Sequence, residues 1–153
     1  MSQLKAGDKA PDFTANDQNG EAVSLSNFSG KTVILYFYPK DDTPGCTAEA
    51  CDFRDNYQSL QEKGFQVIGV STDDEKSHKK FVTKYSLPFP LIADTDQAIV
   101  QAYGVWGEKN MYGKKYMGTN RSTFIIDADG VISHVISKVD TKASSQQVLD
   151  LLG

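Results

Sequence analysis

Two cysteines, Cys46 and Cys51, are the residues of this chain best suited to redox chemistry. They are the only cysteines among 153 residues and lie five positions apart within YPKDDTPGCTAEAC, residues 38–51. This spacing differs from the Cys-x-x-Cys pattern that is typical of many redox and metal sites. The elements that position the two thiols must therefore be worked out before their chemistry.

Cys46 is predicted to lie where a buried strand ends and a helix begins. The run TVILYFY (32–38) is typical of a strand buried on both faces of a sheet, and a helix is expected from near Pro44 to Gly64. Ligands of open α/β sheets bind beyond the carboxyl ends of the strands. Free N–H groups and the helix dipole favour a thiolate there. Cys46 is thus a candidate nucleophile, although a small core residue would explain it equally well.

The rest of the chain predicts one α/β domain over residues 1–153, with a mixed central sheet and helices on both faces. A chain of this length, 39% apolar and 24% charged, can bury one good core. The expected elements begin with an N-terminal hairpin around residues 18–20, a strand at 65–71 and a helix that Asp73 and Asp74 open and that runs through Tyr85. They continue with a strand within 87–93, a helix ending at Gly104, a hairpin of STFIID and VISHVIS (122–137), and a closing helix at 143–152. Residues 104–120 lack clear periodicity and are expected to form a functional or mobile loop.

Charge and hydropathy argue against several classes of partner. The formal net charge of −4 provides no basic face, so we expect neither nucleic acid nor an anionic membrane as a partner. No stretch approaches the roughly 18 apolar residues of a membrane span, and MSQLKAGDKAPDF has no apolar signal region. His78 and His134 do not form metal-binding spacing with the cysteines. We expect a cytoplasmic protein with reduced thiols and with no metal or other cofactor.

The residues around Cys46 resemble the active-site motif of the peroxiredoxins. Pro39, Thr43 and Cys46 form P-x-x-x-T-x-x-C, and YPKDDTPGCTAEACDFRD carries the second cysteine of the bacterioferritin-comigratory, or Q, type. The resemblance continues through GVSTDD and LPFPLIAD to RSTFIID, which supplies Arg121. It implies a thioredoxin-like sandwich and a thiol peroxidase that reduces hydrogen peroxide and organic hydroperoxides without metal, haem or flavin. The cysteine-bearing C-terminal arm of dimeric peroxiredoxins is not present, which favours a monomer.

Thr43 and Gly45 are candidates for peroxide binding. The Thr43 hydroxyl can donate to a peroxide oxygen or to the thiolate, and backbone N–H groups at the helix start, including that of Gly45, can share this task. A threonine here would also serve as an ordinary helix N-cap. Pro39 has no N–H to compete for the thiolate and would shield the sulfur from water, but a simple strand terminator would look the same.

Arg121 and Glu49 are candidates for the charges around the thiol. Arg121 would stabilise the thiolate and the transition state if the strand that it opens lies beside Cys46. An arginine at the end of a loop is otherwise an ordinary solvated residue. Glu49, one turn beyond Cys46, would orient Arg121 or would be an acidic residue of a first helical turn.

The resemblance also implies a use for the second cysteine. Peroxide would convert Cys46 to a sulfenic acid, Cys51 would condense with it, and an external reductant, thioredoxin by resemblance, would reopen the disulfide. Residues five apart on a regular helix have Cα atoms roughly 8.6 Å apart, whereas a disulfide needs under about 7 Å. The first turn or two of the helix must therefore unwind in each cycle, and we expect faster amide exchange across residues 46–55 after oxidation.

Two other functions stay open on the sequence. One is a protein thiol–disulfide exchanger or holdase chaperone, against which the missing Cys-x-x-Cys pattern stands. The other is a binding module with a regulatory disulfide, in which Thr43 and Arg121 would have no reason to converge on Cys46. The positions of these side chains in the fold therefore bear on the function.

Overall fold

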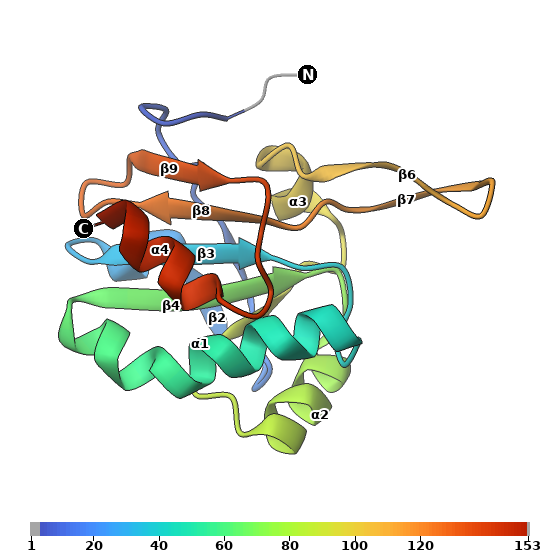
Figure 1. The fold of residues 1–153 in the computed structure, drawn as a ribbon, viewed down its shortest axis with the longest axis horizontal. Coiled ribbons are helices and arrows are strands. Elements are labelled where there is room, and N and C mark those ends of the chain that lie inside the picture. Colours follow the sequence, from blue (N-terminus) through green and yellow to red (C-terminus); the bar gives the residue numbers. More distant parts are fainter. Residues whose placement is uncertain (1–3, 153) are drawn as a thin grey trace.

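The central feature of the protein is a five-stranded mixed sheet, seen in a computed structural model that describes residues 4–152 (Figure 1). Its strands, in spatial order, are β5 (Leu91–Ala93), β4 (Phe65–Ser71), β3 (Thr32–Phe37), β8 (Ser122–Ile126) and β9 (Ile132–Ile136). The first three are parallel, whereas β8 is antiparallel to both β3 and β9. The predicted mixed sheet is confirmed, and residues 1–3 and 153 of the predicted domain lie outside the described part of the chain.

The central strand β3 contributes to two apolar cores because successive side chains of a strand point to opposite faces. Val33, Leu35 and Phe37 belong to the core on one face of the sheet. Ile34 and Tyr36 belong to the core on the other face, and all five side chains are almost fully buried. A continuous apolar run is therefore the pattern that this position requires.

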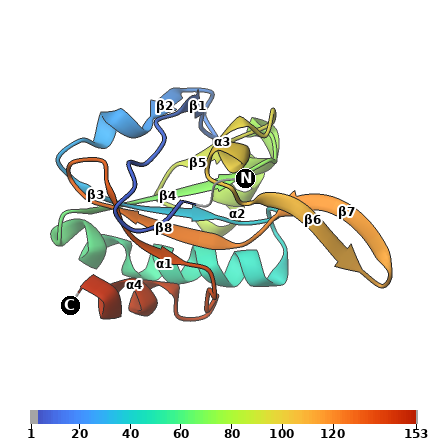
Figure 2. The ribbon, with the colours of Figure 1, turned by 90° about the horizontal axis from the view of Figure 1, so that it is seen from above.

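Helices cover both faces of the sheet, as predicted (Figure 2). The helices α1 (Pro44–Glu62), α2 (Glu75–Tyr85) and α4 (Ser144–Leu152) supply side chains to the core that contains Tyr36. The opposite core is closed by α3 (Ala98–Ala102), the 3-10 helix η1 (Leu25–Phe28) and the N-terminal hairpin of β1 (Thr14–Asn16) and β2 (Ala22–Ser24). Three layers result, with the sheet in the middle.

Helix α1 begins and ends where its sequence predicts. Pro44 occupies the first turn, where its missing N–H is harmless, and Thr43 is the N-cap residue in an extended conformation. The helix stops before Gly64, whose φ of +84° is a conformation that glycine adopts readily. The long helix therefore carries both Cys46 and Cys51 in its first half.

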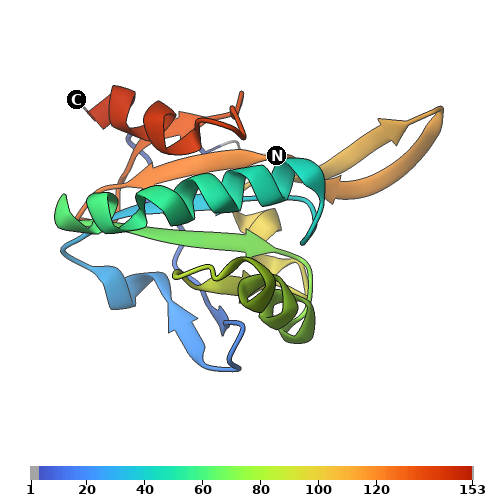
Figure 3. The same cartoon turned by 60° about the horizontal axis from the view of Figure 1, so that its bottom comes forward.

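The prediction of a loop at 104–120 is wrong for most of that segment. Residues 106–119 form an antiparallel hairpin of β6 (Trp106–Met111) and β7 (Lys114–Thr119), which extends beyond the sheet at the end where α1 begins (Figures 1 and 3). Tyr112 and Gly113 both have positive φ, as a two-residue hairpin turn requires. The strands bury little on either side, so they lack the alternating apolar pattern that identifies a strand.

None of the helices among residues 4–152 is both long and apolar enough to cross a membrane.

Candidate active site

Cys46 lies in the first turn of α1, just beyond the carboxyl end of β3. Its side chain is almost fully buried, with 1% of its surface exposed. The thiol is free and belongs to the apolar core beneath α1. The sulfur is therefore placed near the N–H groups of the helix start and away from bulk water.

Arg121 contacts this sulfur directly. Its Nη2 atom donates a hydrogen bond of 3.1 Å to Sγ of Cys46. Strand pairing explains the meeting of two residues 75 positions apart, because Ser122 of β8 lies opposite Phe37, the last residue of β3. Arg121 precedes Ser122 and therefore lies at the edge of the sheet where β3 ends and α1 starts.

Glu49 holds the other side of the same guanidinium. Nη1 of Arg121 donates to Oε1 of Glu49 at 2.7 Å, and the hydroxyl of Ser144 donates to Oε2 at 3.3 Å. The Glu49 side chain is fully buried. Burial raises the pKa of Glu49 to about 7, against the opposing charge and hydrogen bond of Arg121 and the hydrogen bond of Ser144. The carboxyl group therefore changes its charge near neutral pH.

Gly45 provides the space for the guanidinium. A Cβ atom at this position would lie 3.3 Å from Nη2 of Arg121 and 3.8 Å from Cγ2 of Thr141. Any larger residue would therefore press on the arginine that contacts Cys46. The glycine thus has a steric reason to precede the cysteine.

Thr43 and Pro39 lie in the segment that leads from β3 into α1, and neither hydrogen-bonds to the sulfur. The hydroxyl of Thr43 donates to the carbonyl of Lys40 at 2.9 Å, and no side-chain hydrogen bond from Thr43 caps α1. Pro39 is half-buried in the loop that joins β3 to α1. Of the two side chains named as converging on Cys46, the fold brings Arg121 into contact, while the Thr43 hydroxyl points to the backbone.

Cys51 is half-buried and its thiol is also free. It follows Cys46 within one uninterrupted helix, so the regular spacing of α1 keeps the two sulfurs apart. The structure thus places Cys46 with its charged partners and leaves Cys51 outside that group.

A second cation, Lys109 of β6, lies near this group and was not identified from the sequence. Its Nζ atom donates to the carbonyl of Thr119 at 2.7 Å, two residues before Arg121. Burial lowers the pKa of Lys109, and the positive charge of Arg121 lowers it further, whereas Cys46 acts in the opposite direction. The hairpin that sequence periodicity missed therefore brings a charge towards Cys46.

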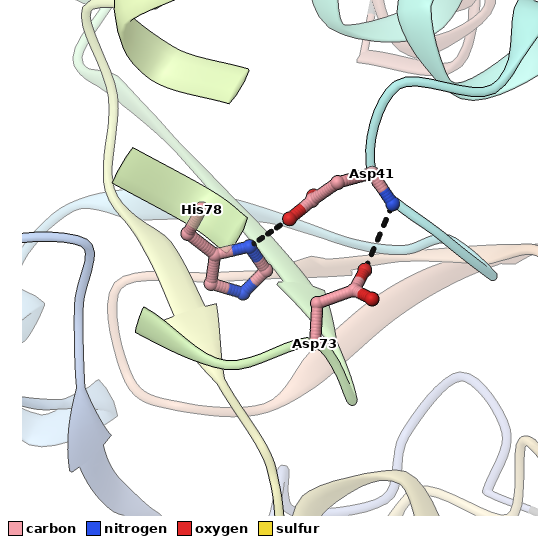
Figure 4. A group of neighbouring side chains, drawn as sticks. All are labelled: Asp41, Asp73 and His78. Carbon is pink, nitrogen blue, oxygen red and sulfur yellow. Dashed lines mark hydrogen bonds and ion pairs between the residues drawn. The ribbon is translucent and has the colours of Figure 1, made fainter. Parts of the chain in front are cut away.

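A buried polar cluster fixes the loop between β3 and α1 (Figure 4). Asp41, Asp73 and His78 each offer one potential metal-binding atom, all within 4.8 Å of one another. These groups bond one another instead, since Nδ1 of His78 contacts Oδ2 of Asp41 at 2.7 Å and the Asp41 N–H donates to Asp73 at 2.8 Å. Burial by itself would lower the pKa of His78, but the hydrogen bond and charge of Asp41 outweigh it and raise this pKa. We therefore interpret the cluster as a buried ion pair that holds the loop.

A second polar contact joins α1 to α4 just after Cys51. The Ser145 N–H donates to Oδ2 of Asp52 at 2.7 Å, and the Ser145 hydroxyl donates to the Asp52 carbonyl at 3.4 Å. The partners are 93 positions apart, and no motif in the sequence indicates this contact. The sequence alone therefore does not predict this contact.

Comparison with known proteins identifies similar chains along nearly the whole length. Residues 6–135 match the AhpC/TSA family. The chain is 47% identical over 152 residues to Peroxiredoxin Bcp of Escherichia coli strain K12, covering 99% of this chain and 97% of the relative. A solved variant of Xanthomonas campestris peroxiredoxin Q is 37% identical, with a TM-score of 0.89 over 97% of this chain and 98% of the other.

A further similar structure concerns the bacterioferritin comigratory protein of Xanthomonas campestris. It is 37% identical to this chain, with a TM-score of 0.86, over 92% of this chain and 89% of the other. That protein was studied in trapped intermediate and ligand complexes for its alkyl peroxide reduction activity.

Proposed function

Because the chain belongs to the AhpC/TSA family, as a peroxiredoxin of the Bcp or Q type, we propose that it reduces peroxides through a Cys46 sulfenic acid resolved by Cys51. Membership establishes a thiol-dependent peroxidase, an oxidoreductase that uses peroxide and a thiol reductant. The observation that carries the proposal for this chain is the 3.1 Å contact from Arg121 to Sγ of Cys46 at the buried start of α1.

In the proposed first step, the Cys46 thiolate attacks one oxygen of the peroxide. An S–O bond forms as the O–O bond breaks, so the sulfur is oxidised to a sulfenic acid and the other oxygen leaves as hydroxide or alkoxide. The leaving oxygen takes up a proton and becomes water or alcohol. Arg121 and the free N–H groups of the helix start, including that of Gly45, stabilise the charge that develops on this oxygen.

The other site residues have supporting roles in this step. Glu49 holds the guanidinium of Arg121 from the side opposite Cys46. The Thr43 hydroxyl would reach a bound peroxide after rotation away from the Lys40 carbonyl, to which it donates in this structure. Pro39 limits access of water to the sulfur from the loop side and offers no N–H that would compete for the thiolate.

In the proposed second step, the Cys51 thiol attacks the sulfenic sulfur of Cys46. An S–S bond forms and the hydroxyl of the sulfenic acid leaves as water. A dithiol reductant, which we take to be thioredoxin, then reopens the disulfide by thiol–disulfide exchange and is itself oxidised. The position of both cysteines in one helix supports unwinding of its first turns during this step, since the regular helix holds their Cα atoms roughly 8.6 Å apart.

We further propose that both hydrogen peroxide and organic hydroperoxides are substrates. The alkyl peroxide reduction activity of the related Xanthomonas campestris protein supports the second class. A single domain that acts as a monomer would suit this cycle, because both cysteines belong to one chain. A reducing compartment such as the cytoplasm would suit it as well, because each disulfide must be reopened by thiols.

Serine variants of the two cysteines test the proposal in stopped-flow oxidation by hydrogen peroxide. Cys46→Ser should abolish peroxide consumption, because a serine hydroxyl does not ionise to supply the nucleophile. Cys51→Ser should consume about one equivalent and then stop as a sulfenic acid that dimedone labels or that excess peroxide converts to sulfinic acid.

Two results would contradict this assignment. One is an equal loss of first-turnover activity in both variants. The other is a rate constant for the reduced wild-type protein that is close to that of free cysteine.

A further inference from the structure

The turns of α1 that carry Cys46 and Cys51 are flanked in the sequence by polar contacts on both sides, buried on the N-terminal side and partly buried on the C-terminal side. One set of contacts precedes the helix, at Asp41, and the other follows Cys51 immediately, at Asp52. Neither set includes Cys46 or Arg121. Each can therefore persist while the sulfur changes its oxidation state.

On the N-terminal side, Asp41 binds three side chains, and we call this group the Asp41 anchor. Its carboxylate accepts hydrogen bonds from the hydroxyls of Tyr38 at 2.6 Å and Ser77 at 2.8 Å, and it pairs with His78 at 2.7 Å. Nε2 of His78 contacts the carbonyl of Ile92 at 2.9 Å and must donate there, so a second proton on Nδ1 faces the carboxylate. These bonds tie the loop before α1 to α2 and β5.

On the C-terminal side, the Asp52 anchor consists of Asp52 and Ser145. The carboxylate receives a backbone N–H from the start of α4 at 2.7 Å, where a negative charge is favoured by the helix dipole. The Ser145 side chain is almost fully buried, and its hydroxyl donates to the Asp52 carbonyl. This contact fixes α1 at the residue that follows Cys51.

Arg121 bonds two side chains of the segment between the anchors. Its guanidinium bonds Cys46 on one side and Glu49 on the other. A thiolate is a charged acceptor, whereas a sulfenic acid is neutral, so oxidation weakens the bond to Arg121. The contacts that loosen on oxidation therefore lie inside the segment, and the contacts that persist lie at its two ends.

We propose that Asp41 and Asp52 are positioning residues that confine the unwinding of α1 to residues 43–51 and keep Cys51 beside Cys46. The inference rests on the proposed Cys46–Cys51 disulfide. A short segment with two fixed ends closes at a smaller entropic cost than a long one. It also leaves the rest of α1 folded on the sheet, so the disulfide forms without general unfolding.

Hydrogen exchange of the wild-type protein tests the boundaries of this segment. The oxidised form is first checked by mass for the loss of two hydrogens and by peptide mapping for a Cys46–Cys51 link. Protection should then fall at residues 47–55 relative to the reduced form, because the N–H groups of residues 52–55 donate to carbonyls of the unwound residues 48–51. It should persist from residue 56 through α1 and in α4. Absence of the link would overturn the proposed function itself. A link accompanied by loss of protection beyond residue 55 or in α4 would overturn only the anchors.

Asp52→Asn tests the second anchor, with Asp55→Asn as the matched control. Asp55 lies on the same helix, its side chain is 64% exposed, and its carboxylate bonds the neighbouring Arg54. With the anchor weakened, the unprotected segment should lengthen by about one turn, and the ratio of sulfinic acid to disulfide at fixed peroxide should rise about threefold or more. The rate of the first oxidation step should stay within about twofold of wild type in both variants, since neither residue contacts the sulfur.

Equal ratios in Asp52→Asn and Asp55→Asn would overturn the role of Asp52. If Asp52→Asn fails to fold, Ser145→Ala replaces it, because this variant removes the hydroxyl and retains the backbone donor. It should raise the ratio in the same direction but less, and an unchanged ratio would also overturn the Asp52 anchor.

For Asp41→Asn, the loss of amide protection should extend to residues 38–42. The control Asp42→Asn, which changes an exposed neighbour bonded to Lys84, should show the wild-type boundary.

Discussion

The two halves of α1 are held in place by different kinds of interaction. In the first half, the defining contacts are polar and meet at Arg121, which bonds both Cys46 and Glu49. In the second half, from Phe53 onwards, Phe53 and Leu60 are fully buried, and the ring centroids of Phe53 and Tyr36 are 4.9 Å apart. Charged contacts change when a group gains a proton or an oxygen, whereas apolar packing does not. One helix can therefore respond to peroxide at one end and stay folded at the other.

Buried charges make the first half of α1 more sensitive to its surroundings than the second half. A buried carboxylate and a thiol next to one guanidinium depend on that guanidinium for much of their stabilisation, and removing one partner of such a buried pair is strongly destabilising. The raised pKa of Glu49 shows that burial outweighs the help it receives from Arg121. The first half is thus the part of α1 whose stability depends on pH and on the state of the sulfur.

Phe53→Ala should produce the largest change and should act on the second half alone. Removing a fully buried ring leaves a cavity, so the free energy of unfolding should fall by about 3–5 kcal/mol. The rate of Cys46 oxidation per folded molecule should change little, because Phe53 contributes no charge to the sulfur. Urea unfolding and stopped-flow oxidation measure the two effects, and Gln58→Ala, an exposed position on the same helix, is the control. If Phe53→Ala slowed the oxidation of Cys46 as much as the loss of Arg121 does, the two halves of α1 would not differ in this way.

Glu49→Gln should make the stability of the first half less dependent on pH. The folded-state pKa of Glu49 is raised from 4.5 to about 7. Its contribution to the free energy of unfolding is therefore fully present below pH 4.5 and is lost as the pH rises through 7. This loss amounts to about 3 kcal/mol, and glutamine, which does not ionise, escapes it.

The measurement is urea unfolding of Glu49→Gln and wild type at several pH values. The difference between them should move in favour of the variant as the pH rises from 4.5 to 7 and should then level off. Asp94, whose pKa is also raised by burial, is present in both proteins and cancels from the difference. A difference that does not depend on pH would show that Glu49 keeps one charge state throughout.

Arg121→Met should slow the first oxidation step more than it changes the fold. The variant removes the donor to Sγ of Cys46 and the cation that stabilises charge on the leaving oxygen, so the rate constant should fall about 100-fold. Arg54→Met is the matched control, since Arg54 lies later on α1 and bonds Asp55 and the Tyr85 carbonyl. It should stay within about twofold of wild type. If both variants slowed the first step to a similar extent, the effect would not arise from the contact of Arg121 with Cys46.

The sequence predicted the elements that have a buried face, and it named the charged partners of the thiol. The runs at 32–38 and 65–71 are apolar because β3 and β4 are covered on both sides, and α1 has proline at its start and glycine past its end. Arg121 was named through the resemblance, and its contact with Cys46 follows from the register of β8 on β3. Patterns that arise from burial or from a shared motif are thus visible in one sequence.

Features that depend on tertiary pairing alone left no such pattern. The hairpin of β6 and β7 is mostly exposed, so its strands show no apolar alternation. The sequence raises His78 only as a possible metal ligand, yet its side chain is buried against Asp41, which lies five residues before Cys46. The contact of Asp52 with Ser145 joins two unremarkable polar residues from distant helices. Each of these follows from how elements pack, which composition and spacing do not specify.

Lys109→Met should have the smallest effect on the rate of the first oxidation step. It tests whether a cation outside α1, beyond Arg121, influences the Cys46 thiolate. Lys109 reaches towards Cys46 from the hairpin, where its Nζ bonds the Thr119 carbonyl. A more distant cation contributes less than Arg121, so the first step should slow about threefold at low ionic strength and less in salt. Lys109→Arg, which keeps the charge, should restore the rate, and Lys114→Met, at an exposed position of β7, should leave it unchanged.

The pH dependence of this effect separates charge from a merely structural role. Burial and the charge of Arg121 lower the pKa of Lys109 below its ordinary value of 10.5. Wild type therefore loses this cation at a lower pH than it loses an exposed lysine, and the gap in rate between wild type and Lys109→Met should narrow as the solution becomes alkaline. A gap of constant size, or one that Lys109→Arg does not close, would mean that Lys109 supports the hairpin rather than the thiolate. The charged side chains that act on the thiolate would then be those of Arg121 and Glu49.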